Sequence, residues 1–79
     1  MRADRKRVWL VGKPPRLLAT FLRRGDEVTP QWEDEAFGFE LRRTGIVVGG
    51  ELLRPADGVP FYEALEAGLA GQSALTVTD

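Results

Sequence analysis

The chain of 79 residues contains no cysteine, no histidine and no asparagine. Without cysteine it forms no disulfide and offers no thiolate to a metal or a substrate, so the reducing cytosol is the compartment we expect. Without histidine it lacks the usual proton shuttle and the commonest transition-metal ligand. Ser73 is the only serine, and a hydrolase triad is excluded because this serine has no histidine to activate it.

Long apolar stretches and catalytic motifs are missing as well. No apolar run approaches the roughly 20 residues of a membrane span, and Val8–Val11 is too short for the core of a signal peptide. Gly12–Lys13 has the position of a phosphate-binding loop, but the prolines that follow lack backbone N–H groups. We therefore expect a cytoplasmic, non-enzymatic protein that binds no metal or other cofactor and no membrane.

Charge, in contrast, is abundant and unevenly distributed. Residues 1–24 carry eight basic and one acidic side chain, a formal charge of +7, whereas residues 25–79 carry three basic and eleven acidic ones, a formal charge of −8. A polarity of this size either gives the folded molecule two opposed surfaces or is neutralised where the two halves meet.

The first third of the chain predicts a strand followed by a helix. Val8–Val11 is continuously apolar and ends at Gly12, as is typical of a strand buried on both faces. Two prolines then favour the start of a helix over residues 14–24, and Gly25 favours its end. The apolar stripe of this helix consists of Leu17, Leu18, Phe21 and Leu22.

The middle of the chain predicts a loop and a hairpin. Residues 26–34 contain a proline and scattered charge, which favours a loop, with a short strand around Val28 as the alternative. Trp32 is expected to fold back onto the core. Ala36–Arg43 alternates apolar and polar side chains and predicts a half-exposed strand. A turn at residues 44–45 leads into a second strand, Ile46–Val48, and Gly49 and Gly50 mark a bulge or its end.

The last third predicts a second helix and a final strand. The helix begins after the Asp57–Gly58 turn, presents the apolar stripe Phe61, Leu65 and Leu69, and ends at Gly71. Residues 74–78 alternate and predict an edge strand.

The predicted order is strand, helix, strand, strand, helix, strand, which is the ferredoxin-like, split βαβ arrangement. We accordingly expect a small α+β domain, βαββαβ, with a four-stranded antiparallel sheet and two helices on one face. It spans residues 1–79 as a single domain, with residues 1–6 as a flexible basic arm. The alternative is a helix packed on a three-stranded meander over residues 28–53.

Two continuously apolar strands require cover on both faces, yet two helices cover only one side of a sheet. If Val8 and Leu10 face the helices, then Trp9 and Val11, beside Val47, form an exposed apolar patch. The leading functional hypothesis is therefore a protein-interaction module, regulatory or accessory, that associates through this face with itself or with another protein. The charge polarity would orient the contact. The opposite facing of the strands remains open at this point.

Single-stranded nucleic acid is the alternative partner. Val8–Gly12 resembles the first-strand motif of the RNA-recognition-motif family, and Ala36–Phe39 resembles part of its second motif. That family keeps its second motif on the third strand, whereas this segment lies on the predicted second one. The resemblance implies stacking of bases on the sheet, assisted by basic side chains near the N-terminus. The candidate contacts are Arg2, Arg5, Lys6, Arg7, Lys13 and Arg16.

Overall fold

The computed structural model describes residues 4–79 and contains a main sheet, two helices, a small hairpin and one 3-10 turn. In chain order the elements are β1 (Asp4–Leu10), β2 (Arg16–Arg24), β3 (Glu27–Trp32), α1 (Glu35–Thr44), β4 (Ile46–Val48), β5 (Glu51–Leu53), η1 (Pro55–Asp57), α2 (Val59–Leu69) and β6 (Leu75–Thr78).

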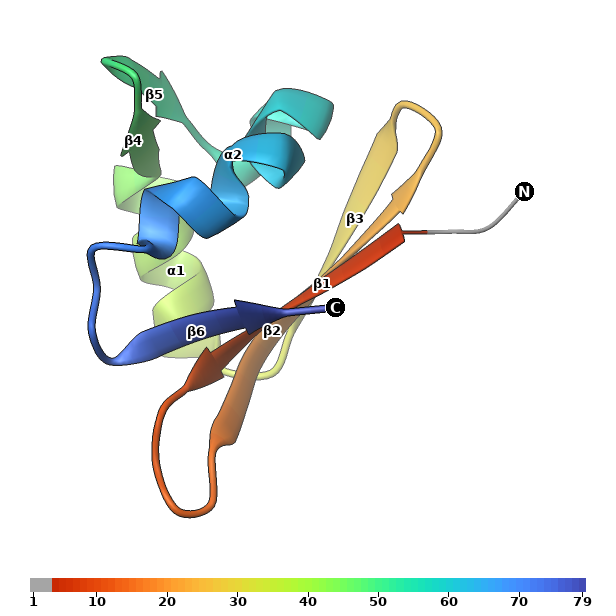
Figure 1. Cartoon of the computed structure of the whole chain (residues 1–79). Coiled ribbons are helices and arrows are strands. Elements are labelled where there is room, and N and C mark those ends of the chain that lie inside the picture. The colour runs from red at the N-terminus through yellow and green to blue at the C-terminus, as the bar shows by residue number, and fades with distance from the viewer. Residues whose placement is uncertain (1–3) are drawn as a thin grey trace.

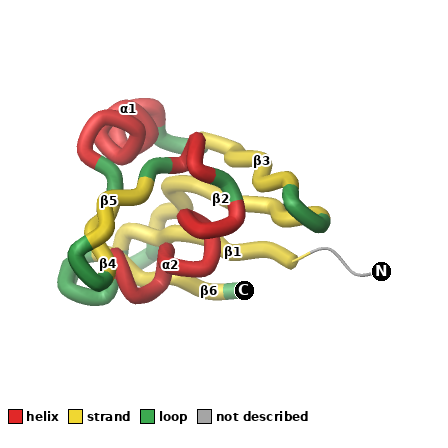
Figure 2. Tube along the Cα trace, turned by 90° about the horizontal axis from the view of Figure 1, so that it is seen from above, coloured by secondary structure: helices red, strands yellow, loops and turns green. Residues whose placement is uncertain are grey.

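The main sheet is four-stranded and antiparallel, in the order β3-β2-β1-β6. Both helices and the β4–β5 hairpin lie on one side of it (Figures 1 and 2). The chain is thus a small α+β protein with a four-stranded antiparallel sheet and two helices, as expected. The predicted βαββαβ order is not what the structure shows, because the first three strands follow one another without a helix.

The segment predicted as the first helix is the central strand β2. Its apolar residues come in two adjacent pairs, a spacing that also fits a helix, but a central strand is apolar on both faces and has no diagnostic period. The register against β1 shifts between Val8 and Trp9, so that Val8 pairs with Ala19 and Trp9 with Leu17. This bulge lets Leu18 turn toward the core, where it is buried.

The segment predicted as the second strand is the helix α1. Asp34 starts it, because its Oδ1 accepts a hydrogen bond from the backbone N–H of Phe37 at 2.9 Å. Phe37 and Leu41, four residues apart, face the core, whereas Phe39 between them is 59% exposed. Gly38 is needed because a Cβ there would lie 2.9 Å from the indole of Trp32.

The predicted hairpin between residues 36–43 and Ile46–Val48 is consequently wrong. Instead, β4 pairs with β5 across Gly49 and Gly50. Both glycines have positive φ, 60° and 80°, which is the backbone of a two-residue type I′ turn. The alternative meander over residues 28–53 is also wrong, since the three consecutive strands of the molecule are β1, β2 and β3.

Several predictions along the chain are confirmed. β1 is a central strand, α2 buries the predicted stripe of Phe61, Leu65 and Leu69, and β6 is an edge strand. The competing prediction of a strand around Val28 is the correct one. Asp4–Lys6, which were predicted to belong to a flexible arm, are part of β1 and pair with β2, and the rest of the predicted arm, residues 1–3, lies outside the described residues.

The core lies between the main sheet and the helices. Phe21 of β2 is fully buried and packs edge-on against Trp32 of β3 and Phe61 of α2, with ring centroids 5.5 and 5.4 Å apart. Trp32 therefore folds back onto the core, as expected. Ile46 of the small hairpin packs so closely on Gly68 that a Cβ there would lie 2.7 Å from it. One side of the sheet is thus filled, and no helix or strand of the described part of the chain, residues 4–79, covers the other side.

Candidate functional site

The strand register identifies the uncovered face of the sheet. Phe21 packs against α2, and its partner on β1 is Lys6, whose Nζ donates to the backbone carbonyl of Tyr62 in α2 at 2.8 Å. Paired residues share a face, and neighbours along a strand alternate. Arg7 and its partner Thr20 consequently face the other way, where no helix lies.

This open face combines three kinds of side chain. A central strand contributes Arg5, Arg7 and Trp9, which follow one another at every second position. Apolar side chains from β2 lie beside them, and hydroxyl and amide side chains occupy the two edge strands. The further members of the face are Leu17, Thr20, Leu22 and Arg24 on β2, Glu27, Thr29 and Gln31 on β3, and Thr76 and Thr78 on β6.

The indole of Trp9 is held in one orientation on this face. Its Nε1–H donates to the hydroxyl of Thr78 at 2.9 Å, and the direct cross-strand partner of Trp9 is Thr76. The ring therefore leans toward β6 and reaches Thr78, the cross-strand partner of Arg7. It is half-buried, so part of its surface remains available for stacking while the hydrogen bond limits its rotation.

Among the predicted basic contacts, only Arg5 and Arg7 lie on the open face. Lys6 points the opposite way and also stacks on the ring of Tyr62, 4.6 Å from its centroid. Lys13 is exposed in the turn between β1 and β2. Arg16, at the start of β2, forms an ion pair of 2.8 Å with Asp34. The sixth predicted residue, Arg2, lies outside the described residues.

The two oppositely charged halves of the chain do meet, but they neutralise each other only in part. Arg16 pairs with Asp34, and Arg23 pairs with Glu63 of α2 at 3.3 Å. Five cations of the basic half form no ion pair with any residue from 4 to 79. Three of them, Arg5, Arg7 and Arg24, lie on the open face; the other two are Lys13, in the turn, and Lys6, which faces the helices.

The apolar patch predicted from Trp9, Val11 and Val47 is not formed. Val11 follows the end of β1 and is 58% exposed, whereas Val47 belongs to the separate β4–β5 sheet and is 65% exposed. Figure 1 shows that hairpin far from the end of β1. The sequence left open which side chains of β1 face the helices. The structure decides this, because Val8 is fully buried toward the helices and Trp9 lies on the open face.

Sequence reasoning missed several members of the open face. Thr20 and Arg24 were not predicted because their segment was interpreted as a helix. Gln31 was not predicted because its segment was interpreted as a loop. Thr20 is 7% exposed between its cross-strand partners Arg7 and Gln31. A usable signal existed only in β6, where threonine alternates with apolar residues and so predicts a polar outer face.

The remaining titratable candidates lie away from this face. Tyr62 is buried beneath Lys6, and burial raises the pKa of its phenol, with the negative charge of Asp4 adding to the effect. A phenol with a raised pKa keeps its proton at neutral pH and is a poor base there. In the acidic cluster before α1, Asp34 caps the helix and pairs with Arg16. Its role there is structural.

Comparison of the chain with protein-family models, with curated proteins and with solved structures finds no match in any of the three. Within residues 4–79, neither helix is long and apolar enough to cross a membrane. Function must therefore be argued from the geometry of the open face.

Proposed function

We propose that this protein is a small non-enzymatic module that binds single-stranded nucleic acid on the open face of its main sheet. The observation that carries the proposal is the row Arg5, Arg7 and Trp9 on one central strand, in which neither arginine has an ion-pair partner within residues 4–79. Positively charged surfaces that also present an aromatic ring are the usual platform for single strands, since every base has a face that can stack.

The rest of the face is consistent with this ligand. Threonine and glutamine side chains on both edge strands supply hydrogen-bond donors and acceptors for base edges and sugar hydroxyls. The acidic residues concentrate on the opposite layer: residues 33–69 carry eight acidic and three basic side chains, a formal charge of −5. That distribution would orient a polyanion toward the sheet and repel it from the helices.

The test is a residue-resolved NMR titration with mixed-sequence single-stranded DNA and RNA, at low and then at physiological salt. We expect saturable shifts at the indole N–H of Trp9 and along β1 and β2 that persist at physiological salt. Trp9→Ala should weaken binding by about 5- to 150-fold, which corresponds to roughly 1–3 kcal/mol for one stacked base. Arg7→Gln should reduce the salt dependence by about one phosphate contact.

A matched control separates a specific face from general attraction. Arg43→Gln removes the same charge from α1, where Arg43 pairs with Glu40 at 2.8 Å. It should leave the affinity and the shifts at Trp9 unchanged. Equal losses for Arg7→Gln and Arg43→Gln, or shifts that vanish at physiological salt, would show that the attraction is only electrostatic and would overturn the proposal.

Protein association was the leading hypothesis from the sequence. One observation supports it, and it concerns a different surface, the β4–β5 hairpin. Val47 and Leu52 are directly paired across the β4–β5 hairpin and are 65% and 45% exposed. An exposed apolar pair on a hairpin is typical of a contact surface. We propose self-association through this pair as the second candidate function. A concentration series of mass measurements tests it, because Val47→Lys should abolish any dimer that the unmodified chain forms.

A further inference from the structure

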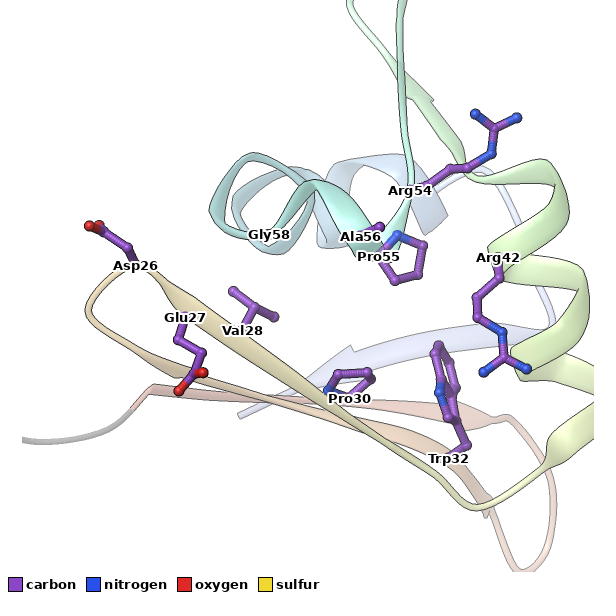
Figure 3. A pocket seen from close by; sticks show the side chains of 10 residues that line it. All are labelled: Asp26, Glu27, Val28, Pro30, Trp32, Arg42, Arg54, Pro55, Ala56 and Gly58. Atoms are coloured by element: carbon purple, nitrogen blue, oxygen red, sulfur yellow. The ribbon is translucent and has the colours of Figure 1, made fainter.

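A slot opens on the covered side of the sheet, beyond the reach of α2. It lies between the edge strand β3 and the segment that contains η1, and its volume is about 570 Å³ (Figure 3). Cavities of roughly 300–1,000 Å³ are typical of small-molecule sites. The residues that line it are Asp26, Glu27, Val28, Pro30, Trp32, Arg42, Arg54, Pro55, Ala56 and Gly58.

The two walls of the slot are apolar and come from distant parts of the sequence. Val28, Pro30 and Trp32 alternate along β3 and point into it, and Pro55 and Ala56 stand opposite them (Figure 3). Trp32 is fixed from behind by Phe21, whose ring lies edge-on at 5.5 Å. The walls are therefore rigid rings and short side chains, which suit a flat apolar ligand.

Charge divides the slot into two ends. The guanidinium of Arg42 lies over the indole of Trp32, 5.1 Å from its centroid, and has no hydrogen-bond or ion-pair partner among residues 4–79. Arg54 adds positive charge at the same end, although its guanidinium points away from the slot and donates to the backbone carbonyl of Arg43. Asp26 stands at the other end, whereas the carboxylate of its neighbour Glu27 points away from the slot, toward the open face (Figure 3).

We propose that this slot binds a small aromatic monocarboxylate. Arg42 is the anchor, because stacking on Trp32 holds its planar guanidinium in place while leaving its N–H groups free for a bidentate contact with a carboxylate. The aromatic ring of the ligand lies between Pro30 and Pro55. A second negative group at the far end would meet Asp26, so dicarboxylates of the same length bind more weakly.

The slot and the open face are independent sites, since they lie on opposite sides of the sheet. Each contains one of the two tryptophans of the chain. Trp32 lines the slot and Trp9 belongs to the open face. The two indole N–H signals therefore report on the two sites separately, and the failure of either proposal is visible without reference to the other.

The experiment is an NMR titration of the full chain with naphthalene-2-carboxylate and with its neutral analogue, 2-naphthamide. We expect the carboxylate to shift the indole signal of Trp32 and the amides of Val28 and Ala56, to leave Trp9 unmoved, and to bind about tenfold more tightly than the amide. Naphthalene-2,6-dicarboxylate should bind more weakly than the monocarboxylate.

Variants at two adjacent arginines provide the matched control. Arg42→Gln should erase the preference for the carboxylate over the amide, and Arg43→Gln, which removes the same charge outside the slot, should preserve it. If Arg42→Gln fails to fold, the relative affinities of the monocarboxylate, the amide and the dicarboxylate for the unmodified chain still test the proposal. Equal affinities of carboxylate and amide, shifts centred on Trp9, or no saturation at millimolar ligand would overturn the proposal.

Discussion

Trp9 and Trp32 lie on opposite faces of the same sheet, and their surroundings differ in kind. Trp32 packs on Phe21, is approached by the bare backbone of Gly38 and carries Arg42 on its ring. The indole N–H of Trp9 donates to the hydroxyl of Thr78, and the ring lies among arginine and threonine side chains.

The comparison shows that the two faces of one small sheet differ in how much they contribute to the stability of the fold. The covered face holds the fully buried residues Val8, Phe21, Phe61 and Leu65, so substitutions there act on the free energy of folding. On the open face, no element among residues 4–79 packs against the sheet, so we expect substitutions there to cost less stability. The predictions that follow test this division, beginning with the largest effect.

The largest effect is expected at Phe21, compared with its neighbour Leu22 on the other face. Phe21→Ala should lower the free energy of unfolding by about 3–5 kcal/mol, because it removes a fully buried ring between two other rings. Leu22→Ala, at a half-buried position, should cost less than about 2 kcal/mol. Urea denaturation measures both. Equal losses would mean that the two faces contribute alike to stability.

The contact between Gly38 and Trp32 comes next. Alanine favours a helix over glycine by about 1 kcal/mol, but a Cβ at residue 38 would lie 2.9 Å from the indole, and overpacking of that kind costs typically 1–3 kcal/mol. We therefore expect Gly38→Ala to be destabilising by about 1 kcal/mol in thermal or urea unfolding. Gly71→Ala, where no atom lies within 4 Å, is the control and should change stability by less than about 0.5 kcal/mol.

Asp34 should show an intermediate effect, since it links the basic half of the chain to α1. Asp34→Ala removes both the helix cap and the ion pair with Arg16 and should cost about 1 kcal/mol. Asp34→Asn keeps an acceptor for the N–H of Phe37 and should cost only a few tenths, because an exposed ion pair contributes about 0–1 kcal/mol. Urea titrations of the two variants measure the difference. If asparagine costs as much as alanine, the ion pair rather than the cap stabilises this end.

The smallest effect concerns pH and Tyr62. The unfolded chain ionises this tyrosine near its ordinary pKa of about 10, whereas the folded protein keeps the proton to higher pH because burial raises the pKa. The folded state then binds more protons above about pH 10, so the free energy of unfolding falls as the pH rises past that value. Tyr62→Phe should remove this part of the alkaline loss, as measured by urea unfolding at pH 9 to 11. An unchanged slope in the variant would contradict the assignment.

Local patterns in the sequence were sufficient to predict an element where a single pattern pointed to one type of secondary structure. Val8–Val11 predicted a central strand because it is apolar without interruption, and the stripe Phe61, Leu65 and Leu69 predicted α2 because no alternative period fits it. Gly49 and Gly50 predicted a bulge or a strand end after Ile46–Val48, and the structure shows the strand end, where both residues adopt positive φ in a tight turn. These features depend on neighbours in the chain, and the structure retains them.

Two predictions were wrong for opposite reasons: β2 was predicted as a helix and α1 as a strand. In β2, apolar side chains on both faces removed the period of two that identifies a strand, and the bulge opposite Trp9 placed two adjacent leucines where a helix would also place them. In α1, the alternation of Phe37, Phe39 and Leu41 imitated a strand, although Phe39 is exposed and the cap at Asp34 was the decisive signal. Short apolar segments of this kind are ambiguous until tertiary contacts select one form.

The sequence by itself determined the α+β class, the separation of charge between the two halves of the chain, and the absence of thiol and imidazole side chains. Only the tertiary structure decided which face of β1 is open, which of its cations lack partners, and that Trp32 and Arg42 meet at a slot. The reason is physical: composition and local period act along the chain, whereas strand register and helix docking join residues far apart in it. No local pattern specifies those contacts in advance.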